Sequence, residues 1–420
     1  MPLEYRFKAK PYDEALKTAL ESFPQKSSCE LIPIADALGR RIAEDIYAPF
    51  DMPLKNIAFY DGYAVRHEDT HGASASNRVK LKVIGSVLKN GEETGLRIDR
   101  GAAVYLSANS PLPEGADAVV REELTSREDD FVLVKKEVEL YEDVVLRGED
   151  AKKGEVLLSR GAIIRPQDQL LLSEIGLSRV RVYREPIIGV ASVGDELLER
   201  FEKGIPYPDN YSFLLSSTLR LTGVKTSSLG ILRDDPDEIA EFISKNIKYY
   251  DCLALIGGAA RGVKDYTGMG IEKIGEVIFH ATTLSPGKVS GVGRVENKPV
   301  FLVPGHIGSA TSCICNVIIP IISKMYYDGV ELLPKVFAKL TEPVEARPGL
   351  YTFRTVSLEW TNEGLNATPH LKRLGGSTLI TILSRARGFI LIPPGVKLSK
   401  GEIVKVTLLN HLEALSWKLS

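Results

Sequence analysis

Apolar positions along the chain change their spacing several times, and each change predicts a change of structure. Near the N-terminus, five apolar side chains recur at helical spacing between Pro11 and Pro24: Ala15, Leu16, Ala19, Leu20 and Phe23. This pattern predicts a short helix. From about 51 to 142, runs such as VKLKVIGSVL and DFVLVKKEVEL alternate with turn residues, which predicts a small β domain. Residues 143–180 return to mixed structure.

Between about 185 and 330, continuous apolar runs alternate with helical patterns. The runs IIGVASV, DCLALI, EVIFHATT and PVFLV are typical of strands covered on both faces. Asn210 is expected to cap one of the intervening helices. This alternation predicts a doubly wound parallel α/β domain.

The last ninety residues become strand-like again, and YTFRTVSLEW, GFILIPPG and EIVKVTLL predict a small barrel. The fold class is therefore multidomain α/β plus β. We divide the chain into an elongated linker subdomain (1–50 and 143–180), a small β domain (51–142), the α/β domain (181–330) and a C-terminal β-barrel domain (331–420).

Composition narrows the class of protein. The 420 residues are 44% hydrophobic and 26% charged, with 53 basic and 55 acidic side chains, so the net charge is −2. This balance argues against nucleic acid or an anionic membrane as a partner. No uninterrupted apolar run approaches 18 residues, so we expect no membrane helix. The first ten residues lack the apolar core of a secretory signal.

Four cysteines form no disulfide framework, which favours a reducing, cytoplasmic location. Cys313 and Cys315 lie in an apolar stretch with no other cysteine or histidine nearby in sequence. We interpret them as buried helix packing, and not as half of a metal site.

The candidate chemistry follows the four apolar runs. After them come Gly194-Asp195-Glu196, Gly257-Gly258 with Arg261, Gly262 and Asp265, then Pro286-Gly287-Lys288, and finally Pro304-Gly305-His306. The carboxyl ends of parallel strands share one edge of a sheet, where ligands bind. Glycine amides suit phosphate oxygens, and Lys288 supplies positive charge. Glu196, Asp234 and Asp265 are candidate ligands for Mg²⁺.

Taken singly, each glycine loop is also consistent with a tight turn, and Asp234 with a cap. Walker A, G-x-G-x-x-G and G-x-S-x-G motifs are absent from the sequence. His306, which opens a helix at the expected edge, is the histidine most suited to touch a ligand. We interpret the other five as surface or packing residues: His67, His71, His280, His370 and His411.

These motifs, in this order, resemble the molybdopterin molybdenumtransferase family, which includes MoeA and the E domain of gephyrin. Besides the loops above, the resemblance rests on Asp61-Gly62-Tyr63-Ala64-Val65, on the run PLPEGADAVV from Pro111, on Arg147-Gly148-Glu149-Asp150 and on Gly230-Ile231-Leu232-Arg233-Asp234-Asp235. It covers nearly the whole chain.

The resemblance implies a central domain like those of MogA and MoaB, four subdomains and a homodimer. It implies insertion of molybdate, or tungstate, into adenylylated molybdopterin, with release of AMP and a need for Mg²⁺. A MogA/MoaB-type adenylyltransferase is an implied partner. The positions that match acidic family residues tied to activity are Asp61, Asp150, Glu196, Asp234 and Asp265. Ser309, Arg354 and Ser377 join the substrate-binding candidates, the last two because they fall near positions associated with molybdate.

The chain departs from the family pattern at several loop positions. Ser285 stands where the family has a lysine, Ala108 where it has a threonine, and His306 where it has an asparagine. The stretch before Asp61 reads NIAFY. Two alternatives therefore stay open beside the enzyme: a catalytically weakened pterin-binding or scaffold paralogue, and a nucleotide-processing hydrolase.

Overall fold

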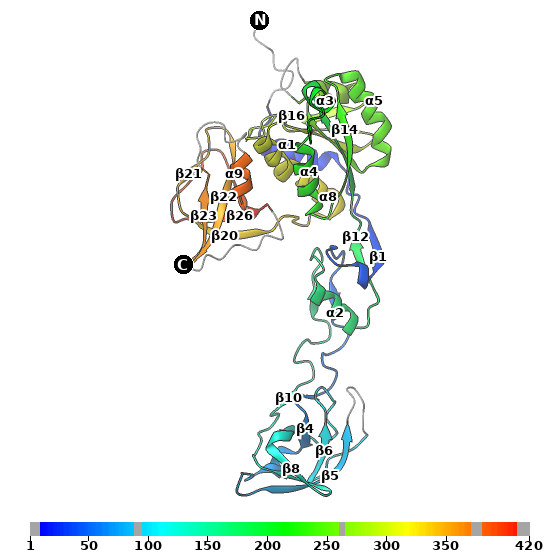
Figure 1. The fold of residues 1–420 in the computed structure, drawn as a ribbon, viewed down its shortest axis with the longest axis vertical. Helices are drawn as coiled ribbons and strands as arrows, with labels where there is room; N and C mark the ends of the chain where they lie inside the picture. Colours follow the sequence, from blue (N-terminus) through cyan, green and yellow to red (C-terminus); the bar gives the residue numbers. More distant parts are fainter. Residues whose placement is uncertain (1–8, 88–94, 260–264, 371–379, 410–420) are drawn as a thin grey trace. The chain divides into compact units, whose positions relative to one another are not determined.

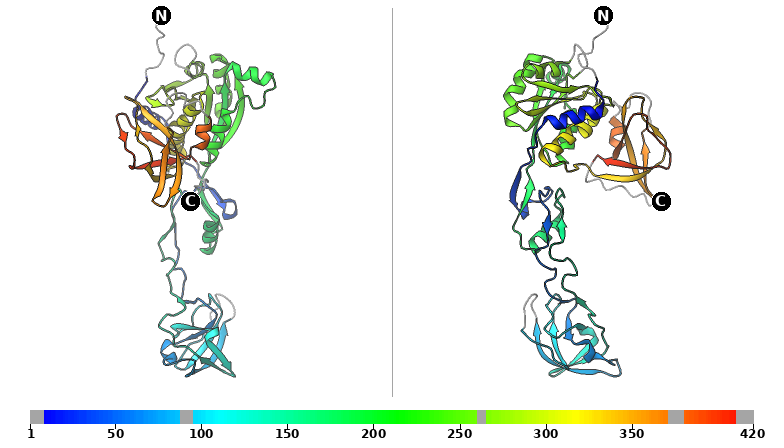
Figure 2. Two further views of the ribbon diagram at one scale, coloured as in Figure 1. Left: turned by 60° about the vertical axis from the view of Figure 1, so that its left-hand side comes forward. Right: turned by 180° about the vertical axis from the view of Figure 1, so that it is seen from behind.

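The computed structural model describes residues 9–87, 95–259, 265–370 and 380–409. The chain forms two compact units, one made of 1–43 with 179–420 and the other of 44–178. Figures 1 and 2 show the elements of each unit as ribbons. The four-part division expected from the sequence is finer than this one and stays a prediction.

The first unit contains a six-stranded mixed sheet. Its strand order is β14 (Lys225–Leu232), β13 (Ile187–Val193), β15 (Cys252–Gly257), β19 (Lys298–Val303), β18 (Gly291–Val295) and β16 (Glu276–His280). The first four strands pair in parallel. Since β18 is antiparallel to both β19 and β16, β16 runs in the same direction as those four. The α/β prediction is confirmed, and β18 is the strand it missed.

The sequence of β18 explains why it was missed. Gly291 and Gly293 remove the apolar signal of a buried strand, yet both are needed for packing. A Cβ at Gly291 would lie 2.7 Å from the carbonyl oxygen of Phe279, and one at Gly293 would lie 2.5 Å from Ile271. The close approach of neighbouring elements therefore requires glycine here.

Helices cover both faces of this sheet. On β13, Ile188 and Val190 belong to one apolar core, whereas Ala191 and Val193 belong to another on the opposite face. The helices of this unit that pack around the sheet are α1 (Tyr12–Ser22), α3 (Asp195–Glu202), α4 (Tyr211–Arg220), α5 (Pro236–Asn246), α6 (Tyr266–Glu272), α7 (Ile307–Cys313) and α8 (Ile319–Tyr326). Alternation of core residues along one strand makes the fold doubly wound.

Helix α1 was correctly predicted, and it packs into the first of these cores. Ala15 and Ala19 are fully buried there, and the Tyr12 hydroxyl donates a 2.8 Å hydrogen bond to the carbonyl of Asn316. The N-terminal cap of α4 differs from the prediction, which assigned it to Asn210. Within the described residues the Asn210 side chain makes no cap bond, and the carboxylate of Asp209 instead accepts from the Ser212 amide at 3.3 Å.

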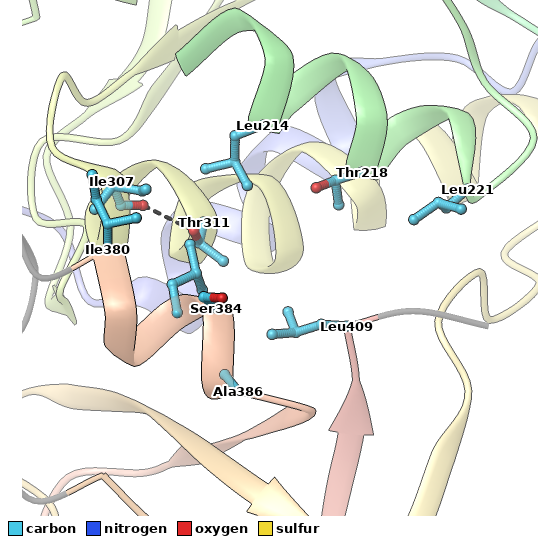
Figure 3. Close-up of a pocket in the computed structure, with 10 residues that line it drawn as sticks. Leu214, Thr218, Leu221, Ile307, Thr311, Ile380, Ser384, Ala386 and Leu409 are labelled. Atoms are coloured by element: carbon cyan, nitrogen blue, oxygen red, sulfur yellow. Dashed lines mark hydrogen bonds between the residues drawn. The ribbon is translucent and has the colours of Figure 1, made fainter. Parts of the chain in front are cut away.

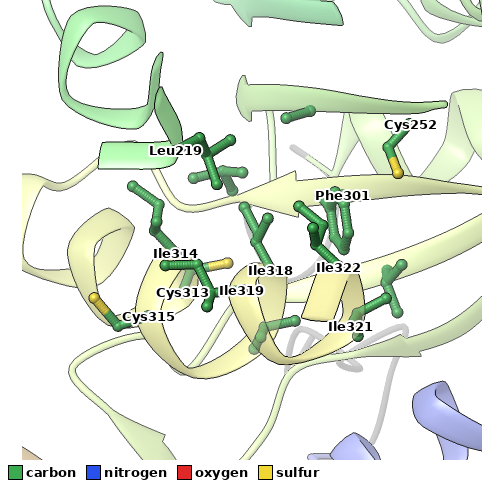
Figure 4. Close-up of a cluster of buried hydrophobic side chains, with 14 of the residues drawn as sticks. Leu219, Cys252, Phe301, Cys313, Ile314, Cys315, Ile318, Ile319, Ile321 and Ile322 are labelled. Carbon is green, nitrogen blue, oxygen red and sulfur yellow. The ribbon is translucent and has the colours of Figure 1, made fainter. Parts of the chain in front are cut away.

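One long helix, 307–326, runs through the core. It includes a π-helical segment, Ile314–Ile318, directly before α8. Pro320 has no N–H and cannot donate the usual helical hydrogen bond to the preceding turn. The wider π-helical turn just before it accommodates this missing bond. Figure 4 shows Ile318 and Ile322 of this helix pointing toward Phe301 of β19.

The length and composition of helix 307–326 would suit a membrane span, but 78% of the tested window is buried inside the protein. It is a core helix. The sequence predicted a buried helix here, carrying Cys313, and this prediction is confirmed. Cys313 and Cys315 are buried free thiols on it, which confirms the packing interpretation. Burial raises the pKa of each thiol to about 12.

The C-terminal strands of the same unit close into a barrel. The closed strands are β22 (Tyr351–Thr361), β23 (Gly364–Pro369), β20 (Lys335–Leu340), β26 (Ile403–Leu408) and β24 (Gly388–Ile392), with β24 pairing back to β22. A short strand, β17 (Leu284–Ser285), adds to β22 in parallel. Helix α9 (Ile380–Arg385) accompanies them. The barrel prediction is confirmed.

The second unit holds a six-stranded sheet of its own. Its order is β7 (Ala118–Arg121), β4 (Gly62–Val65), β6 (Ala102–Leu106), β5 (Val79–Val87), β9 (Phe131–Val134) and β8 (Thr125–Glu128). Strand β5, which the sequence predicted as a strand-like run, alternates more buried and more exposed positions. The unit also contains the pair β3 (Ile57–Ala58) with β10 (Val144–Val145) and helix α2 (Pro166–Glu174).

Candidate functional site

The carboxyl ends of β13, β15, β16 and β19 lie at one edge of the central sheet. The four strands run in the same direction, as the ladder pairings require. The glycine-containing loops expected from the sequence therefore leave the same edge. This arrangement is the geometry that open α/β sheets use to bind ligands.

The loops after β13 and β14 hold two acidic side chains together. The Asp195 amide donates to Asp234 at 3.5 Å, and the Asp234 amide donates to Asp195 at 3.3 Å. Asp195 and Glu196 are exposed, and Asp234 is half-buried. Backbone groups thus hold two carboxylates side by side in contact with solvent, where their mutual repulsion favours a cation.

Gly257 and Gly258 bring the β15 loop against β13. Both have positive φ, +98° and +57°. A Cβ on Gly257 would lie 2.2 Å from the carbonyl oxygen of Val193, and one on Gly258 would lie 2.8 Å from the Thr267 hydroxyl. Both positions require glycine because of their conformation and because of the available space. The structure therefore confirms a tight approach of main chain at this edge.

Asp265 is buried and caps α6. One carboxylate oxygen accepts from the Gly268 amide at 3.1 Å, and the other lies 3.1 Å from Nδ1 of His280. Neither side chain has any exposed surface. Asp265 is therefore built to hold the β15–α6 loop in place against the end of β16.

His280 was interpreted from the sequence as a surface or packing residue, and its bond to Asp265 was missed. Its position in the sequence could have indicated this bond. His280 is the last residue of β16, at the sheet edge where the other candidate site residues lie. Histidine at the end of a buried strand needs a polar partner, and the nearby loops offered one.

The loop after β16 turns at Pro286, Gly287 and Lys288. Lys288 is exposed, while its carbonyl accepts from the Thr282 amide at 2.8 Å. Gly287 has φ +113°. Ser285 is 7% exposed and pairs through β17 with Thr352. Lys288 is consequently the cation that this turn presents to solvent among its described residues.

The loop after β19 opens helix α7. Pro304 is buried, whereas Gly305 and His306 are exposed, and Ser309 lies half-buried one turn into the helix. The His306 carbonyl accepts from the Ala310 amide at 2.7 Å. His306 is therefore the residue at the N-cap of α7, and a helix N-terminus is a favourable position for an anion.

Arg354 lies on β22 of the barrel and donates to the carbonyl of His370 at 3.0 Å. Burial and the charge of Arg347 lower the pKa of this guanidinium. Three further predicted residues, Arg261, Gly262 and Ser377, lie outside the described residues.

Asp61 and Asp150 belong to the second unit. Asp61 is exposed, and one of its oxygens accepts from the Ala108 amide at 2.7 Å. Asp150 is also exposed, and its amide donates to the Met52 carbonyl at 3.0 Å. The structure thus places the five predicted acids in two units, three in the first and two in the second.

A three-carboxylate magnesium site does not form. Within the described ranges, no three His, Cys, Asp or Glu side chains gather closely enough to hold a metal ion. Asp265 faces inward, so the proposed ligand set of Glu196, Asp234 and Asp265 does not fit. Glu196 and Asp234 both reach solvent, and Mg²⁺ commonly uses one or two carboxylates together with substrate phosphates.

A separate apolar pocket lies among α4, α7 and α9 (Figure 3). Its lining includes Leu214, Leu383 and Leu409, and it contains no charged side chain. It therefore lacks the donors and charges that the sheet edge offers to an anion.

Residues 10–176 match the model of the MoeA N-terminal region (domain I and II), residues 189–324 that of the probable molybdopterin binding domain, and residues 338–409 that of the MoeA C-terminal region (domain IV). The chain is 30% identical to the molybdopterin molybdenumtransferase of Bacillus subtilis over 423 residues, covering 98% of this chain and 96% of that protein. The chain belongs to the MoeA family.

Two further comparisons support this membership. A Methanocaldococcus jannaschii protein named for molybdopterin biosynthesis is 32% identical, with 93% of this chain and 94% of that protein covered. The crystal structure of the MoeA protein from Pyrococcus horikoshii OT3 is 29% identical, with a TM-score of 0.76, and covers 96% of this chain and all of that chain. MoeA proteins are enzymes of molybdenum cofactor biosynthesis, and the recognition from sequence motifs is confirmed.

Proposed function

We propose that this chain inserts molybdate, or tungstate, into adenylylated molybdopterin and releases AMP. The observation that carries the proposal is the shared edge of β13, β15, β16 and β19. It combines glycine turns, the exposed cation Lys288, the exposed acid Glu196 and the half-buried acid Asp234. Such an edge suits a substrate with phosphate groups and a metal oxyanion.

The glycine loops serve to bind the anionic part of the substrate. Gly287 and Gly305 let backbone amides approach phosphate oxygens, and the N-terminus of α7 adds favourable partial charge. Lys288 neutralises the developing negative charge on the leaving phosphate. Ser309 and Arg354 remain candidates for contact with the oxyanion.

Mg²⁺ fits as a shared ion between protein and substrate. Glu196 and Asp234 would hold it, and it would polarise the phosphoanhydride. In this proposal Asp265 is a positioning residue, since its carboxylate is committed to Gly268 and His280.

The remaining parts of the proposal concern assembly. A cytoplasmic homodimer, with a MogA/MoaB-type adenylyltransferase as the source of substrate, agrees with the family membership. Asp61 and Asp150 are proposed to contribute to activity from the second unit. Sedimentation of the purified chain tests the dimer.

Molybdate-dependent activation of an apo-molybdoenzyme tests the reaction. The full chain would be mixed with adenylylated molybdopterin, Mg²⁺ and molybdate. Saturable activation with AMP release is expected. Pterin binding without activation would favour the scaffold paralogue, and hydrolysis of free dinucleotides without molybdate would favour the hydrolase. Tungstate in place of molybdate distinguishes the two metals.

A further inference from the structure

Two neighbouring aromatic side chains are exposed beside Asp61. Phe59 is 54% exposed and Tyr60 is 40% exposed. Their ring centroids are 4.6 Å apart and their planes meet at 78°. Large aromatic side chains normally bury their surface, so this exposed pair in the second unit invites a functional explanation.

The rings are fixed in place by their surroundings. The Phe59 amide donates to the carbonyl of Asp143 at 2.9 Å. The Asp143 carboxylate accepts two 2.8 Å bonds from Arg121, and the guanidinium of Arg121 lies 4.1 Å from the centre of the Tyr60 ring. Asp143 therefore holds Phe59 through its backbone and Tyr60 through Arg121. A preorganised ring pair loses little entropy when a ligand binds.

Asp61 supplies an acceptor next to this pair. Its oxygen Oδ1 accepts from Ala108, but a carboxylate has about four acceptor positions. The adjacent Gly62 packs so closely against β7 that a Cβ would lie 2.3 Å from the Val120 carbonyl oxygen. The position of Asp61 is thus set by main-chain packing on one side and by the Ala108 amide on the other.

We propose that the Phe59 ring, with Tyr60 held at a steep angle beside it, forms a stacking platform for the pterin ring, whose N–H edge donates to Asp61. A pterin carries an amino group at C2 beside N3–H, two parallel donors that match a carboxylate as a guanidinium does. Adenine presents a ring acceptor beside its amino group, which a carboxylate repels. The platform therefore selects the pterin over the adenine of the same substrate. This inference rests on the proposed function, because the pterin substrate comes from it.

Calorimetric titration of the full chain with pterin (2-amino-4-oxopteridine) and, separately, with AMP tests the platform. Phe59→Leu keeps an apolar side chain but removes the flat ring, and it is expected to weaken pterin binding about tenfold. Tyr47→Leu, a 52% exposed tyrosine on β2 (Ile46–Tyr47) of the same unit, is the matched control. AMP affinity should not change in any of them.

Equal pterin affinity in Phe59→Leu and the unaltered chain would overturn the inference, as would absence of pterin binding by the unaltered chain. A change of oligomeric state in Phe59→Leu at constant pterin affinity would also overturn it, and would assign the patch to a second copy of the chain. The proposed function is judged separately by molybdate-dependent activation. If the unaltered chain activates the apo-enzyme and Phe59→Leu binds pterin as tightly as the unaltered chain, the platform is contradicted and the proposed function stands.

Discussion

The loops after β13 and β15 leave the same edge of one sheet, yet they treat their acidic residues in opposite ways. The β15 loop buries Asp265 completely and satisfies both of its oxygens inside the protein. The β13 loop leaves Asp195 and Glu196 in solvent beside Asp234. One loop provides a rigid frame and the other provides charge. The sequence motifs contain both the buried acid and the exposed acids, and it is their burial in the structure that distinguishes a structural role from a charge-bearing one.

We expect the largest loss of stability from a substitution at Gly257, in the rigid β15 loop. Gly257→Ala places a Cβ 2.2 Å from a carbonyl oxygen at a positive φ, so we expect a loss of about 3 kcal/mol of unfolding free energy. Urea denaturation measures it. Gly395→Ala is the matched control, because Gly395 has φ +77° but open space around it. It should cost only about 1 kcal/mol, and equal losses would remove the argument from close packing.

Asp265→Ala removes the cap of α6 and the partner of His280. We expect it to lower the unfolding free energy by about 2 kcal/mol. Asp265→Asn can still accept from the Gly268 amide, so its loss should be less than half of that. Thermal unfolding of the two variants compares them. If the two variants lose the same unfolding free energy, the hydrogen bond from the Gly268 amide does not account for the contribution of Asp265 to stability.

For the half-buried acid Asp234 we expect a small effect on stability and a large effect on activity. Asp234→Asn is expected to change stability by less than about 0.5 kcal/mol and to lower molybdate-dependent cofactor formation at least tenfold, because a ligand charge for Mg²⁺ is lost. Asp235→Asn is the control, since asparagine is an equally good cap for α5. Raised Mg²⁺ should partly restore the activity of Asp234→Asn, and full activity without it would remove Asp234 from the site.

A smaller effect concerns His370 in the barrel. Burial, followed by the charges of Arg354 and Arg385, lowers the pKa of His370. The unfolded chain therefore binds the proton first, and stability should fall as pH drops below about 6.5. His370→Asn should flatten this part of the pH profile, as followed by urea denaturation at several pH values. An unchanged profile would mean that another group causes the acid sensitivity.

The sequence predicts most of the fold because its signals are local. The runs in β13, β15 and β19 are continuous and apolar, and the strands of the barrel alternate. Strand β18 escapes because two glycines, required by close packing, remove its apolar pattern. Helix 307–326 is predictable as a buried helix, but its π-helical segment, Ile314–Ile318, is not predicted from the sequence.

The candidate site is predictable in part for a related reason. Strand direction brings the loops to one edge, and this follows from the order of strands and helices. Whether an acid faces solvent or protein depends on contacts between residues far apart in sequence, such as Asp265 with His280. The sequence therefore named the acids but could not separate the buried Asp265 from the exposed Asp195 and Glu196.

The most direct test compares Asp234→Asn with Asp265→Asn in one assay of molybdate-dependent cofactor formation, at a temperature where both variants remain folded. The account predicts that Asp234→Asn loses most activity at unchanged stability, while Asp265→Asn keeps the larger share of activity and loses some stability. Near-normal activity in Asp234→Asn together with a complete loss in folded Asp265→Asn would contradict it.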